Sequence, residues 1–151
     1  MAGRTRSTRP ISLALRVTGA LALLAMGALH LQQYLDAGYS ALPTIGTLFL
    51  LNFVGGVALG VALLLPVGRL PRLGASAPGL LAVTGAAMAA TSFVFLLISE
   101  QTPLFGFLET STSSALTVAL VTEAVATLAL SAFAATSVRS APRSRHIHVA
   151  H

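Results

Sequence analysis

The sequence predicts an all-α integral membrane protein, a four-helix bundle with both chain ends in the cytoplasm (N-in/C-in). Three observations predict this fold class. Of the 151 residues, 55% are hydrophobic and 9% are charged, whereas a soluble domain has roughly 25% charged residues. Four apolar stretches are long enough to cross about 30 Å of hydrocarbon. Arginines gather in alternate segments between those stretches.

The four spans form one transmembrane domain over residues 13–136. Each has about 20 mostly apolar residues: 13–35, 44–66, 76–99 and 113–136. An Arg-rich tail (1–12) precedes the domain, and an Arg- and His-rich tail (137–151) follows it. Pro43 and Pro66 fall at the ends of the second span, where proline does not interrupt helical hydrogen bonds.

The charged residues predict the orientation. Eight arginines lie before the first span, between the second and third, and after the fourth: Arg4, Arg6, Arg9, Arg69, Arg72, Arg139, Arg143 and Arg145. The other two loops, 36–43 and 100–112, contain no arginine and carry Asp36, Glu100 and Glu109. Since arginine is enriched in cytoplasmic loops, both tails and the middle loop are expected on the cytoplasmic side.

The first span has an alternative interpretation as a cleaved signal peptide, residues 1–29. Basic residues precede its apolar run, and small residues lie near Gly27. The run is long, however, and the helical pattern continues from His30 through Tyr34, which favours a membrane anchor. Cleavage would leave three spans with the same orientation.

Small residues at regular spacing predict how the helices pack. Gly56 and Gly60 form a GxxxG pair in the second span, and Asn52 lies on the same face. The fourth span has a small or polar residue at every fourth position: Ala115, Ala119, Glu123, Thr127 and Ser131. These faces predict a compact bundle with Glu123 turned toward protein, although GxxxG equally serves a homodimer.

Polar side chains from all four helices are expected in one layer of the outer half of the bundle. At 1.5 Å per residue, Glu123 lies roughly 14 Å from the outer end, Asn52 and Thr91/Ser92 about 11 to 12 Å, and His30 about 7 Å. A charged carboxylate at this depth is costly, so Glu123 is expected to be protonated or partnered by His30, Asn52 or a hydroxyl.

Two interpretations of this layer stay open. His30, Asn52 and Glu123 are candidates for a site that takes a proton, a cation or a polar small molecule, with Tyr34 and Glu109 as contributors on the outer face. Alternatively, the same residues only hold the helices together, through hydrogen bonds worth about 0.6 kcal/mol each.

The residue types argue against several other functions. Haem between membrane helices usually needs two axial ligands, and His30 is the single histidine within the spans. The tail histidines, His146, His148 and His151, have no neighbouring carboxylate, so no metal and no cofactor are expected. The arginines flank apolar spans, which indicates lipid contact rather than nucleic-acid binding. No nucleophile-elbow motif is present, so an enzyme is not expected.

Several segments resemble a known group of proteins. They are, in order, His30-Leu31 with Tyr34, the run from Pro43 to Asn52 (PTIGTLFLLN), Leu104-Phe105-Gly106-Phe107 with Glu109, and Glu123. In this order the chain resembles uncharacterised small four-span membrane proteins of actinobacteria, over residues 16–136. The resemblance implies the fold and the topology, and it brings no activity with it.

Together these features predict a multi-pass protein of a bacterial plasma membrane. All nine basic residues are arginine, which is typical of a GC-rich bacterial coding sequence. The leading hypothesis is a non-catalytic structural or accessory subunit that contacts the lipid bilayer and either a second copy or another membrane protein. The alternative is a small transporter, channel or ligand-binding membrane protein whose site is His30, Asn52 and Glu123.

Overall fold

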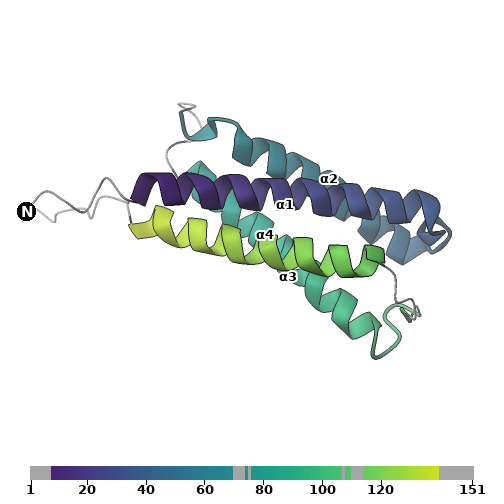
Figure 1. Cartoon of the computed structure of the whole chain (residues 1–151). Coiled ribbons are helices and arrows are strands. Elements are labelled where there is room, and N and C mark those ends of the chain that lie inside the picture. The colour runs from purple at the N-terminus through teal and green to yellow at the C-terminus, as the bar shows by residue number, and fades with distance from the viewer. Residues whose placement is uncertain (1–7, 70–73, 75, 107, 110–113, 140–151) are drawn as a thin grey trace, which may run out of the picture.

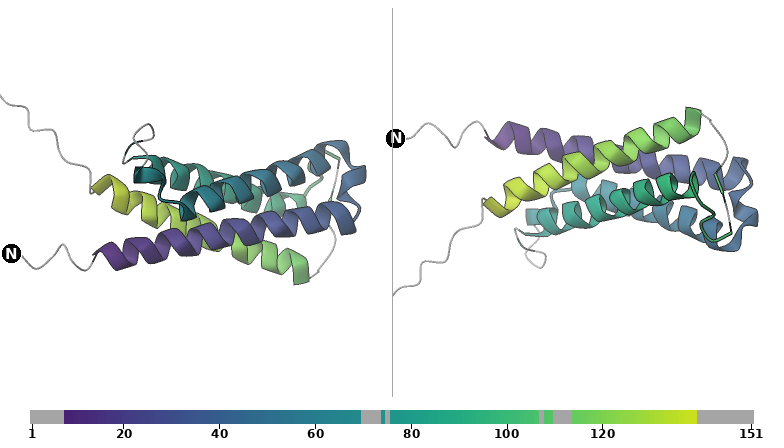
Figure 2. Two further views of the ribbon diagram at one scale, coloured as in Figure 1. Left: turned by 90° about the horizontal axis from the view of Figure 1, so that it is seen from above. Right: turned by 90° about the horizontal axis from the view of Figure 1, so that it is seen from below.

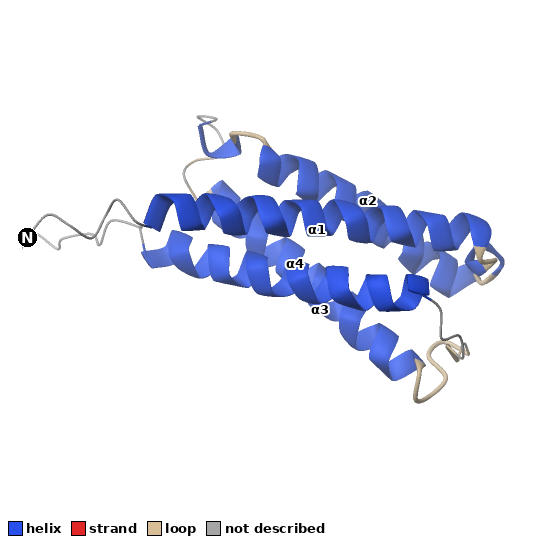
Figure 3. Cartoon of the chain, viewed as in Figure 1, coloured by secondary structure: helices blue, strands red, loops and turns tan. Residues whose placement is uncertain are grey.

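The chain folds into four long α-helices. The computed structural model describes residues 8–69, 74, 76–106, 108–109 and 114–139. The helices and two single 3₁₀ turns follow in this order: α1 (Thr8–Asp36), η1 (Tyr39–Ala41), α2 (Pro43–Leu64), η2 (Val67–Arg69), α3 (Ala77–Ser99) and α4 (Ser114–Arg139). The described residues contain no extended strand (Figure 3). The prediction of an all-α four-helix bundle is confirmed.

Each helix is long and apolar enough to cross a membrane, with candidate spans of 28, 22, 23 and 24 residues. The helices run up and down, so the start of α1 and the end of α4 lie at the same end of the bundle (Figures 1 and 2). The opposite end carries the residues that connect α1 to α2 and α3 to α4, and we call it the loop end. Which side of a membrane the loop end faces stays a prediction, since the helices qualify as spans by length and composition alone. Of the arginines on which the orientation rests, Arg4, Arg6, Arg72, Arg143 and Arg145 lie outside the described residues.

Small side chains fill the interior while large apolar side chains cover the outside. Most buried hydrophobic residues are alanines, and the larger fully buried ones are Leu23, Met26, Leu63 and Leu130. Leu128 is 71% exposed, like many other leucines and valines on the outer faces. This distribution fits a lipid surrounding, because lipid tails are as apolar as leucine and helices then associate through close packing of small residues.

The GxxxG pair of α2 packs against α1 of the same chain. A Cβ atom added to Gly56 would lie 2.8 Å from the backbone oxygen of Leu23 and 3.2 Å from the Cα atom of Gly27. One added to Gly60 would lie 3.0 Å from the backbone oxygen of Ala20. This face of α2 is therefore occupied within the chain. The other side of α2 is more loosely covered, since α3 diverges from α1 and α2 toward the loop end (Figure 1).

Candidate functional site

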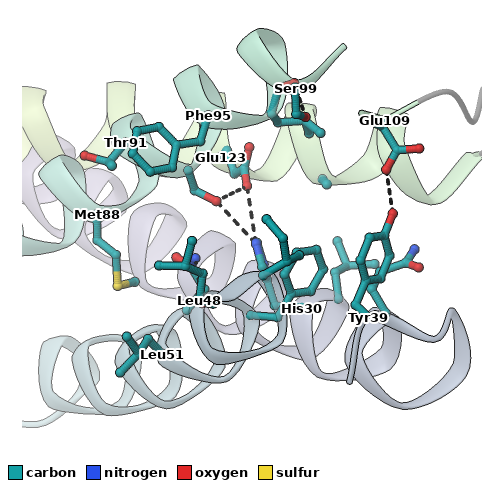
Figure 4. A pocket seen from close by; sticks show the side chains of 18 of the residues that line it. His30, Tyr39, Leu48, Leu51, Met88, Thr91, Phe95, Ser99, Glu109 and Glu123 are labelled. Atoms are coloured by element: carbon teal, nitrogen blue, oxygen red, sulfur yellow. Dashed lines mark hydrogen bonds and ion pairs between the residues drawn. The ribbon is translucent and has the colours of Figure 1, made fainter. Parts of the chain in front are cut away.

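A cavity of about 590 Å³ lies within the half of the bundle nearest the loop end. All four helices contribute to its wall, which is mostly apolar (Figure 4). Of the residues predicted as a site, His30, Asn52, Glu109 and Glu123 line this cavity. Tyr34 does not line it; a Cβ added to Gly46 at the start of α2 would lie 3.3 Å from the Tyr34 ring.

Ser92 joins His30 to Glu123 across three helices. Its hydroxyl, on α3, donates to Glu123 Oε1 on α4 at 2.7 Å and lies 3.2 Å from His30 Nε2 on α1. The direct distance from His30 Nε2 to Glu123 Oε1 is 3.8 Å. We call these three residues the polar triad; Figure 4 shows its contacts as dashed lines. The partner of Glu123 is thus a serine hydroxyl, with His30 beside it.

One backbone contact fixes the tautomer of His30. Its Nδ1 lies 2.9 Å from the carbonyl oxygen of Met26, which can only accept, so Nδ1 carries a hydrogen. The other nitrogen, Nε2, can be protonated or not. If it is protonated, His30 donates to Ser92, and Ser92 donates to a Glu123 carboxylate. If it is not, a protonated Glu123 donates to Ser92, and Ser92 donates to His30. The two arrangements contain the same number of protons, with the extra one on His30 in the first and on Glu123 in the second, and both complete the same hydrogen-bond chain.

The second oxygen of Glu123 is not part of this chain. Glu123 is only 1% exposed, and its Oε2 is buried without a hydrogen-bond partner among the described residues. Buried polar atoms are nearly always hydrogen-bonded, so Oε2 is a candidate contact for water or a ligand. In both of these proton arrangements Oε2 can accept a hydrogen bond, so a hydrogen-bond donor would suit it.

Asn52 lines the cavity without joining the triad. Its side-chain amide donates to the backbone oxygen of Leu48, one turn earlier in α2, at 3.1 Å. The structure therefore brings His30 and Glu123 together through Ser92 and leaves Asn52 apart from them. Its amide dipole remains part of the cavity wall.

Tyr39 and Glu109 connect the two loops at the loop end of the cavity. The Tyr39 hydroxyl donates to Glu109 Oε2 at 2.5 Å, and the Tyr39 ring stacks on Phe49 at 4.6 Å. The backbone N–H of Glu109 donates to the Ser99 oxygen at 2.8 Å, which holds the second loop against α3. Burial and the neighbouring carboxylate raise the pKa of the Tyr39 phenol above its ordinary value.

Tyr39 is not among the site residues that the sequence predicts, and sequence reasoning missed this contact. The sequence contains little indication of this contact, because Tyr39 and Glu109 lie 70 positions apart. Gly38, which takes a positive φ of 80°, turns the chain so that Tyr39 follows in a short 3₁₀ turn.

The described residues contain no group of three or more His, Asp or Glu side chains that could hold a metal ion. The tail histidines His146, His148 and His151 lie outside the described part of the chain. No protein-family model, no curated protein and no solved structure matches this sequence or fold.

Proposed function

We propose that this chain is a multi-pass membrane protein that binds a small organic molecule in its cavity, with the polar triad as the polar end of the site. The observation that carries the proposal is a cavity of about 590 Å³ lined by a buried carboxyl group, Glu123, that keeps one oxygen unpartnered among the described residues.

The size of the cavity favours an organic ligand over an ion. Pockets for small molecules usually measure about 300 to 1,000 Å³, whereas a water molecule takes up about 30 Å³ of the liquid. A proton or a bare cation on Glu123 would leave most of the 590 Å³ unused. A molecule with several carbon atoms fills such a space.

The chemistry of the wall supports a ligand with an apolar body and one polar group. Apolar side chains such as Leu48, Phe49 and Met88 make up most of the wall, and hydrogen-bonding groups are few. Sites of this kind use their few polar groups to orient the ligand. Because Glu123 Oε2 can accept a hydrogen bond, a hydroxyl or an amine suits it best.

A second candidate function is the structural or accessory subunit predicted from the sequence. One observation favours it: Ser92 ties α3 to α1 and α4 through a single hydroxyl, as hydrogen bonds that only hold helices together would do. In that case a second copy or another membrane protein would be the functional partner.

The proposal extends to location and topology. The arginine pattern supports an N-in/C-in orientation in a bacterial plasma membrane, with the loop end outside. The resemblance to the actinobacterial four-span proteins agrees with this arrangement. We propose no catalytic role for Glu123.

The test is infrared difference spectroscopy of the Glu123 carboxyl stretch in lipid nanodiscs, with Glu123→Gln as the control that identifies the band. Dodecylamine, dodecanol, dodecane and sodium ions are added separately. A saturable change with the amine or the alcohol, absent with dodecane, is expected. A response to sodium ions and pH alone would favour an ion site instead. A band that ignores every addition would contradict ligand binding and favour the accessory subunit.

A further inference from the structure

The wall of the cavity is incomplete on one side, between α2 and α3. The lining residues that are exposed all belong to these two helices: Leu51 on α2 and Thr84, Ala87, Thr91 and Phe95 on α3. The lining residues of α1 and α4 are buried or half-buried. The cavity therefore opens sideways, through the seam between α2 and α3.

This opening lies at the depth of the hydrocarbon core. On α3 it extends from Thr84 to Phe95, which at 1.5 Å per residue is about 6 to 22 Å from the loop end of that helix. The whole of α3 is apolar and long enough to cross a membrane, and the core of a bilayer is about 30 Å thick. A molecule at the opening thus meets lipid tails.

The loop end of the cavity is bridged instead. Tyr39 and Glu109 bind each other across it, and the Tyr39 ring lies against Phe49. Among the described residues, a ligand that came from water at the loop end would meet this bridge. A ligand that came from the bilayer would meet the exposed lining residues of α2 and α3, among them Leu51 and Phe95, which are 61% and 36% exposed.

We infer that the ligand is a membrane-dissolved amphiphile with a single apolar chain, which enters between Leu51 and Phe95 and places a hydrogen-bond-donating head at Glu123. The inference rests on the proposed function and adds the class of ligand and its route. The apolar chain lies along the α2–α3 seam, and the head donates to Glu123 Oε2. The route requires no movement of the loop end.

The absence of tryptophan from the chain makes a clean test possible. Phe95→Trp places one fluorescent reporter at the opening. Val118→Trp is the matched control, because Val118 is 46% exposed and lies four residues from the loop end of α4, but does not line the cavity. Both variants, in nanodiscs, receive ω-bromododecanol, whose bromine quenches tryptophan on contact. We expect saturable quenching at position 95 and only a linear, bulk-lipid effect at position 118.

The route is tested by the rate of quenching in the Phe95→Trp background. Ala87→Phe narrows the opening and should slow quenching several-fold, and Leu51→Ala widens it and should speed quenching. Tyr39→Phe, which breaks the bridge at the loop end, should leave the rate unchanged. An acceleration by Tyr39→Phe without an effect of Ala87→Phe would overturn the lateral route and leave the binding site standing.

A second probe distinguishes a wrong ligand class from a wrong proposed function. Bromododecane lacks the head group and is expected to show a weaker saturable component than the alcohol. Equal quenching by both probes would overturn the assignment of the head to Glu123. No saturable quenching by either probe, together with an unresponsive carboxyl band, would overturn the proposed function itself.

Discussion

Replacing Gly56 by alanine should loosen the seam between α1 and α2. The added Cβ would lie 2.8 Å from the backbone oxygen of Leu23, which is 0.6 Å short of the 3.4 Å at which ordinary contact begins. Backbone cannot rotate away as a side chain does, so the two helices must move apart. Gly55→Ala is the matched control, because its nearest neighbour is the sulfur of Met88, 2.7 Å away at the flexible end of a side chain.

The size of the effect follows from two opposed contributions. Alanine stabilises a helix interior by about 0.5 to 1 kcal/mol relative to glycine, and this gain is common to both variants. Overpacking costs about 1 to 3 kcal/mol where the surroundings cannot relax. Gly56→Ala should therefore be less stable than Gly55→Ala by about 1 to 3 kcal/mol, or roughly 5- to 150-fold in the unfolding equilibrium.

The assay is reversible unfolding in mixed micelles with an increasing fraction of sodium dodecyl sulfate, followed by circular dichroism. Both variants and the wild type are measured under the same conditions. If Gly56→Ala proved as stable as Gly55→Ala, the close approach of α1 and α2 at Leu23 would be wrong, and the GxxxG pair would be free to serve a contact between copies.

Three further predictions concern the loop end, the triad and the core. The pKa of the Tyr39 phenol is raised in the folded state, so the stability that this phenol contributes is present below a pH of about 10 and is lost as the pH rises beyond it. The fall of the unfolding free energy with rising pH should therefore be less steep in Tyr39→Phe than in the wild type, and unchanged in Tyr34→Phe. Ser92→Ala removes the hydroxyl that joins three helices and should cost about 0.6 to 1.7 kcal/mol in the same micelle assay, whereas no loss would contradict the triad. Leu130 is 0% exposed, and Leu130→Ala should lower the free energy of unfolding by about 2 kcal/mol, which is the low end for soluble cores because lipid is as apolar as leucine. Leu128 is 71% exposed, and Leu128→Ala should leave the free energy of unfolding almost unchanged.

Sequence patterns predicted the helices well, because length and hydropathy decide a membrane span locally. The helix periodicity was less reliable at long range. Ala115, Ala119 and Glu123 of the predicted ridge on α4 line the cavity, but Ser131 is exposed. A four-residue step advances about 400° around a helix with 3.6 residues per turn, so the ridge drifts about 40° per step and leaves the interior.

Which residues contact one another in the candidate site was harder to predict than the depth of the site in the membrane. Residues at similar depth on four helices are candidates for contact, and this argument brought His30, Asn52, Thr91, Ser92 and Glu123 into one layer. It could not choose Ser92 over Asn52 as the partner of Glu123, because the choice depends on how each helix is rotated. Asn52 turns its amide to the backbone of its own helix instead. The pairing of Tyr39 with a second loop depends on tertiary structure alone.

The distribution of small residues explains why the bundle opens on one side. In α2, Gly56 faces α1; in α3, Gly85 faces Leu23 of α1 and Leu130 of α4. These two glycines therefore lie against α1 or α4, whereas Gly55 of α2 meets the side chain of Met88 on α3. The seam between α2 and α3 has larger side chains, among them Leu51, Met88 and Phe95, which line the cavity. The tight seams and the open one thus have a common cause, and the cavity follows from it because close packing cannot be satisfied on every face at once.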